Sequence, residues 1–196
     1  LLAVGQGHDN YPNGGYSTIT SIKYNTVALT SINTATVNPD PSWFRSSVYY
    51  MVAPSSGANT IEVVLSATAN TAGGGAVSYT GTKQTGQPDA QNVATSTTGT
   101  TQSVDVTTSD DSSWVVAVFM DNGQDPTPGQ TQRWEVVSGT GEAGQDTDGP
   151  KTPSGVQTMS WTTVSNAFWI VNGASFAPVT GVVSGAGLKR KIIIIE

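Results

Sequence analysis

Short runs in which apolar and polar residues alternate recur along the whole chain, and this pattern limits the fold more than any other feature. Examples are TIEVVL (residues 60–65), SVDVT (residues 103–107) and QTMSWT (residues 157–162). Successive side chains of a β-strand point to opposite faces, so each run predicts a strand with one buried and one solvent-facing side. We find no segment with a sustained helical period and capping residues. The chain is therefore predicted to be all-β.

Two longer apolar runs, residues 114–120 and 168–176, predict central strands that are covered on both faces. Residues that favour turns separate the runs, because glycine tolerates positive φ and proline presets a bend. These turn segments are residues 13–15, 54–57, 73–75, 122–123 and 153–155. Roughly ten to twelve strands result, which favours a two-sheet antiparallel β-sandwich of the jelly-roll type.

The domain organisation follows from where these strand patterns stop. Residues 1–178 are predicted to form one β-sandwich domain, and residues 179–196 a Gly-rich linker followed by an apolar strand. Within the domain, residues 81–101 and 139–155 are expected to be long loops, which are often either functional or simply flexible.

Charge and cysteine content exclude several classes of function. Charged residues make up 11% of the chain, against roughly 25% in an average domain, and the net charge is −6. Because the chain has no basic stripe, no nucleic-acid partner is expected. The absence of cysteine excludes thiol chemistry and cysteine–zinc sites. No apolar stretch approaches the roughly 20 residues of a transmembrane helix, so no membrane span is expected.

Five segments carry a resemblance to a known group of proteins. They are IKYNTVALT (22–30), YYMVAP (49–54), AVSYTG (76–81), GQTQRW (129–134) and TMSW (158–161). In this order they resemble extracellular jelly-roll β-sandwich modules of large bacterial surface proteins and of phage structural proteins. The resemblance implies a module at a cell or virion surface with no shared catalytic residues. It covers most of residues 1–178 and excludes the C-terminal segment.

Candidate catalytic groups are few, and the chain is not expected to be an enzyme. His8 is the only histidine, lies in a Gly- and Asn-rich segment, and is interpreted as a solvated loop residue rather than a triad base. A carboxylate pair for glycoside cleavage would have to come from Glu62, Glu135 and Glu142. Glu62 and Glu135 occupy the polar phase of alternating strands, where a charge normally faces water.

One acidic turn is a candidate calcium site. Asp121, Asn122 and Asp125 place oxygen ligands at short spacing, as calcium requires. The segment does not match the twelve-residue EF-hand loop, and Asp and Asn are also common turn residues. Calcium is thus the one cofactor that the sequence suggests, with a simple turn as the alternative.

Aromatic residues near turns are candidates for stacking on sugar rings. These candidates are Tyr11, Tyr16, Trp43 and Phe44. They support the alternative hypothesis of a carbohydrate-binding, adhesive surface module. The other four tryptophans lie inside apolar runs and are assigned to the core: Trp114, Trp134, Trp161 and Trp169.

The C-terminal segment contains four consecutive isoleucines: Ile192, Ile193, Ile194 and Ile195. A strand of this sequence is apolar on both faces, so in water it needs a groove that covers it. One hypothesis is that this strand is donated to an open sheet of another copy, which would build a filament. The alternative is that it closes its own sheet near residues 1–4. The leading prediction is therefore a non-enzymatic structural subunit of an extracellular filament or surface assembly, and a phage virion or decoration protein is a related alternative.

Overall fold

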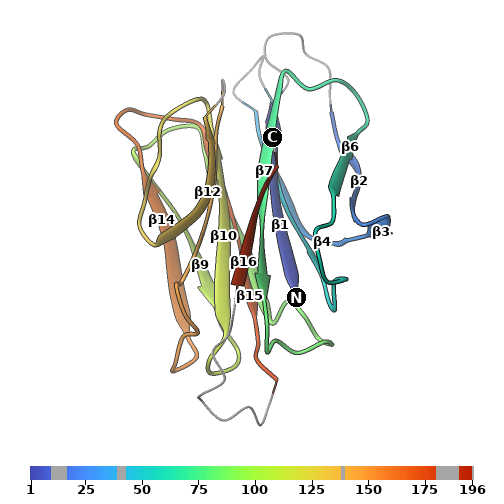
Figure 1. Cartoon of the computed structure of the whole chain (residues 1–196). Coiled ribbons are helices and arrows are strands. Elements are labelled where there is room, and N and C mark those ends of the chain that lie inside the picture. Colours follow the sequence, from blue (N-terminus) through green and yellow to red (C-terminus); the bar gives the residue numbers. More distant parts are fainter. Residues whose placement is uncertain (10–16, 39–42, 138–139, 180–189, 196) are drawn as a thin grey trace.

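The computed structural model describes residues 1–9, 17–38, 43–137, 140–179 and 190–195 (Figure 1). Within these residues the regular elements are sixteen β-strands, and every strand pairing is antiparallel. The all-β class and the antiparallel sandwich are thus confirmed, whereas the jelly-roll topology stays a prediction. None of the described segments is a helix long and apolar enough to cross a membrane.

Two five-stranded sheets form the sandwich. The first has the order β16-β7-β1-β5-β4, and the second has the order β12-β13-β10-β15-β8. The strands of the first sheet are β1 (Leu2–Asp9), β4 (Thr30–Val37), β5 (Phe44–Met51), β7 (Thr71–Tyr79) and β16 (Arg190–Ile195). Those of the second are β8 (Ala90–Ser96), β10 (Trp114–Asp121), β12 (Thr131–Val137), β13 (Gly141–Asp146) and β15 (Trp169–Phe176).

A three-stranded sheet covers the outer face of each large sheet, so the molecule has four layers (Figure 1). The order β3-β2-β6 covers the first sheet, and β11-β14-β9 covers the second. Their strands are β2 (Ile19–Tyr24), β3 (Val27–Ala28), β6 (Ile61–Leu65), β9 (Thr101–Thr107), β11 (Thr127–Pro128) and β14 (Val156–Thr162).

The layers enclose separate apolar clusters. Between the large sheets, Trp114 and Phe176 pack against Tyr79. Phe119 stacks on Trp161 between the second large sheet and its cover, with ring centroids 5.3 Å apart. Because each large sheet is covered on both faces, β10 and β15 are buried along their whole length, as their continuous apolar runs predicted.

The two halves of the chain repeat the same strand order. β1 lies between β5 and β7, and β10 lies between β13 and β15. The hairpins β4–β5 and β12–β13 share a register shift, between Ser31 and Asn33 in one and between Gln132 and Trp134 in the other. In the covers β2 pairs with β6, and β11 with β14. β16 lies beside β7 as β8 lies beside β15.

Three expectations about local structure are wrong. The two segments expected to be long loops contain β8 and β13, both of which pair with strands of the second sheet. Residues 73–75, expected to form a turn, lie inside β7. A Cβ built on Gly75 would overlap the indole of Trp134, so glycine serves the close approach of the two sheets there rather than a turn.

Candidate functional site

The C-terminal strand β16 lies along β7 in an antiparallel ladder. Arg190 pairs with Tyr79 and Ile195 with Gly74. The other edge of β7 pairs with β1, so β7 separates β16 from the N-terminal strand. In this arrangement the isoleucine run closes the first sheet of its own chain, one strand away from the residues 1–4 beside which such closure was expected.

The sequence of β7 makes it a suitable acceptor for this strand. Val77 and Tyr79 anchor it in the core between the two large sheets. Without β16, β7 would be the edge strand of the first sheet, with a row of backbone N–H and C=O groups available for pairing. Any extended segment with suitable side chains could therefore pair with β7 as β16 does.

Two pairs of an acid and a threonine meet at the interface between the large sheets. The Thr71 hydroxyl donates to Asp9 Oδ1 at 2.8 Å and lies 2.9 Å from the hydroxyl of Thr140, which in turn donates to Glu142 Oε1 at 2.7 Å. Asp9 and Glu142 are both almost fully buried. These contacts bring β1 and β7 of the first sheet together with the start of β13 in the second.

Burial changes the acidity of these groups. The pKa of Glu142 is raised from 4.5 to about 7, mainly by burial and in smaller part by the charges of Asp9 and Asp121, against the opposing hydrogen bond from Thr140. Burial also raises the pKa of Asp121 to about 6, although backbone N–H groups oppose the change. Because Gly7 and Gly73 pack directly on the Glu142 side chain, this carboxyl is enclosed by two strands.

Replacing Glu142 with glutamine should therefore change how stability depends on pH. A carboxyl whose pKa is raised by folding stabilises the protein at low pH and loses this contribution as the pH rises from about 4.5 through about 7. The rise in pKa corresponds to about 3 kcal/mol. Relative to the parent, Glu142→Gln should gain up to this amount between pH 4 and pH 8, as measured by urea unfolding.

The exposed Glu62 provides the matched control, since its ion pair with Lys23 lies at the surface. Glu62→Gln should show the same stability difference from the parent at both pH values, within about 1 kcal/mol. A pH-independent effect of Glu142→Gln would show that Glu142 is ionised in the folded protein at neutral pH.

The predicted calcium ligands lie at the end of β10 and in the turn after it. Asp121 is fully buried, and its Oδ1 accepts hydrogen bonds from the backbone N–H groups of Gly123 and Gln124, both at 3.0 Å. Asn122 and Asp125 are exposed. In the part of the chain that the structure describes, no group of three or more His, Cys, Asp or Glu side chains could hold a metal ion. The calcium site stays a prediction, and the Asp121 contacts are those of a turn-forming aspartate.

Of the four proposed sugar-stacking residues, the structure describes only Trp43 and Phe44. Tyr11 and Tyr16 lie outside the described residues, and Trp43 is half-buried. Phe44 is only 5% exposed and stacks on Phe168 with ring centroids 6.4 Å apart. The proposal for Phe44 is therefore wrong, because its ring belongs to the core. The core assignment of the other four tryptophans is confirmed.

His8 differs from the expectation of a solvated loop residue. It lies in β1 with 1% of its surface exposed, its Nδ1 3.1 Å from Gln6 Oε1 and its Nε2 3.2 Å from the carbonyl of Ser17. Burial lowers its pKa. The Gly- and Asn-rich residues that follow concealed the strand that ends at Asp9.

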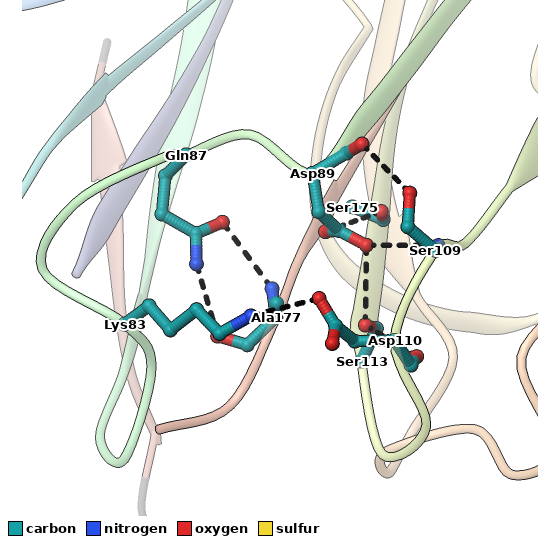
Figure 2. A network of polar contacts seen from close by, with 8 residues as sticks. All are labelled: Lys83, Gln87, Asp89, Ser109, Asp110, Ser113, Ser175 and Ala177. Carbon is teal, nitrogen blue, oxygen red and sulfur yellow. Dashed lines mark hydrogen bonds and ion pairs between the residues drawn. The ribbon is translucent and has the colours of Figure 1, made fainter. Parts of the chain in front are cut away.

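A polar network braces the segment that connects the two halves (Figure 2). Asp89 accepts hydrogen bonds from the Ser175 hydroxyl at 2.6 Å and from the Ser109 backbone N–H at 3.2 Å. Gln87 exchanges two hydrogen bonds with the backbone of Ala177, and Lys83 pairs with Asp110 at 2.8 Å. Figure 2 shows that these contacts join residues 83–89 to residues 109–113 and 175–177.

Comparison of the chain with protein-family models, with curated proteins and with solved structures gave no match.

Proposed function

We propose that this protein is a non-enzymatic structural subunit of an extracellular assembly, in which copies are joined by exchange of the C-terminal strand. The observation that carries the proposal is the ladder between β16 and β7. Among the described residues, β16 is the outermost strand of its sheet. Its main-chain pairing with β7 would be the same whether the strand came from its own chain or from another.

The repeated use of one donor and one acceptor determines the form of the assembly. The donated strand and the accepting edge of β7 are different surfaces, so the contact is heterologous and continues from copy to copy. A contact of this kind builds a filament unless the rotation between copies closes a ring. A cell surface or a virion surface is the proposed location, and a phage decoration protein would use the same contact.

Deletion of residues 188–196 tests the exchange. We expect a soluble, folded monomer that no longer assembles, because it keeps the acceptor edge of β7 but has no strand to donate. Electron microscopy of the purified full chain and of the deletion variant measures this difference. If the deletion variant instead fails to fold, β16 is needed to close its own sheet and the proposal is wrong.

The deletion variant should also cap growing filaments of the full chain. In excess it would accept a strand without passing one on, so mean filament length should fall as its concentration rises. The matched control is a full chain carrying Val164→Ala, a substitution at a residue that is 93% exposed. This control keeps both donor and acceptor and should leave the length distribution unchanged.

A further inference from the structure

The strand β6 has one unpaired edge among the described residues. Its only strand partner there is β2. The N–H groups of Asn25 and Ser66 donate to Thr60 and Thr18, which directs the backbone of residues 60, 62, 64 and 66 toward β2. By alternation, the backbone N–H and C=O groups of Ile61, Val63 and Leu65 point to the open side.

A groove runs along this open edge. Its volume is about 460 Å³, and β6 forms one wall with Ile61, Val63 and Leu65. β7 contributes Ala72, Gly73 and Gly74. Ala72 is exposed. Val63 and Leu65 are only half-buried, although their side chains lie on the same face of β6 as the buried Ile61. The groove thus combines apolar side chains with an unpaired strand edge.

The second half of the molecule shows what occupies the equivalent position. There β14, the counterpart of β6, pairs with β11 on one edge and with β9 on the other. β9 lies over β15, the counterpart of β7: a Cβ on Gly173 would lie 2.5 Å from Val106 Cγ2 and 3.0 Å from Val104 Cγ1. Both valines are buried. In the first half no described strand takes the position of β9.

We propose that the groove beside β6 accepts one further β-strand from a partner polypeptide, a segment with valine-sized apolar side chains at alternate positions that runs antiparallel to β6. The main-chain groups of Ile61, Val63 and Leu65 supply the pairing, and the apolar side chains of the incoming strand cover β7 as Val104 and Val106 cover β15. This site is separate from the edge that β16 occupies, so it does not depend on strand exchange.

A peptide with the sequence of β9, TTQSVDVTT (residues 100–108), is a suitable probe for the full-length protein. At saturating peptide, the exchange rate of the amide hydrogens of Ile61, Val63 and Leu65 should fall by about tenfold or more, because these amides become hydrogen-bonded to the new strand. The amides of Glu62 and Val64, which face β2, should be unaffected. Amide hydrogen exchange followed by NMR measures both groups in one experiment.

Two matched controls make the result specific. Ala72→Asp places a charge in the groove at an exposed position and should weaken peptide binding about tenfold or more. Val27→Asp introduces the same charge at the opposite edge of the same cover sheet, where Val27 is 59% exposed, and should have no effect. A peptide with aspartate at both valine positions should not bind.

Absence of protection at Ile61, Val63 and Leu65 with the β9 peptide would overturn the proposal, as would equal protection by the aspartate peptide. Protection of these amides in the peptide-free protein that rises with protein concentration, and that Ala72→Asp abolishes, would also overturn it. The occupant would then be a second copy of this chain rather than a partner polypeptide.

Discussion

Replacing Trp134 with alanine is expected to lower the free energy of unfolding by about 3–5 kcal/mol. The indole is only 4% exposed and lies between the two large sheets with Val48 and Val118. A Cβ on Gly75 or on Gly144 would overlap its ring. Because both strands approach the ring this closely, they cannot collapse far enough to fill the space that alanine would leave. Urea unfolding at pH 7 measures the loss.

Gly75→Ala provides the test that the ring itself is responsible. In the parent, the added methyl group collides with the indole and should cost about 1–3 kcal/mol. In the Trp134→Ala background the same methyl enters the vacated space, so the double variant should be clearly more stable than the sum of the two single effects predicts. Additive effects, or a loss below about 1 kcal/mol for Trp134→Ala, would contradict this account of the interface.

The strands predicted correctly from the sequence are those whose pattern reflects their own environment. In β9 and β14 one face packs on β10 and β15 while the other is at least partly exposed, and their residues alternate accordingly. The run from Trp114 to Met120 is continuous because β10 is covered on both faces. In these cases the burial of each residue can be read from the strand alone.

The strands that the sequence pattern did not predict are those whose residues are determined by side chains on neighbouring strands. β13 has the sequence GEAGQD, which has neither apolar alternation nor β-branched residues, yet all six residues are buried. Gly144 is required by the indole of Trp134, and Asp146 by the guanidinium of Arg133. Such requirements come from residues on other strands, so no local pattern indicates them.

The repeat of strand order has a weak counterpart in the sequence. AVSY (residues 76–79) in β7 corresponds to GASF (residues 173–176) in β15, and the turns PSSG (residues 54–57) and PSG (residues 153–155) precede equivalent cover strands. Aligning the two halves on these segments would have matched β6 with β14 and β7 with β15 as equivalent strands. The open position beside β6 follows from that comparison.

Replacing Arg133 with alanine is the second change with a large expected effect. Its side chain is 4% exposed and its guanidinium pairs with Asp146 at 2.5 Å, and Asp146 is fully buried. Tyr79, from the other half of the chain, donates to the same carboxylate at 3.1 Å. Removing the cation leaves the charge of Asp146 without its salt-bridge partner inside the interface, which typically costs about 3–5 kcal/mol.

Asp148 offers the matched control, because it also pairs with Arg133, at 2.7 Å, but its side chain is 56% exposed. Asp148→Asn should cost less than about 1 kcal/mol, because it removes the charge while asparagine tolerates the positive φ of this residue. Asp146→Asn in the Arg133→Ala background should recover part of the loss, since it removes the charge that has lost its ion pair with Arg133. If Arg133→Ala and Asp148→Asn had equal effects in urea unfolding, the buried arm of the ion pair would not stabilise the contact between the halves. The two halves would then be held together mainly by the apolar clusters around Trp114 and Trp134.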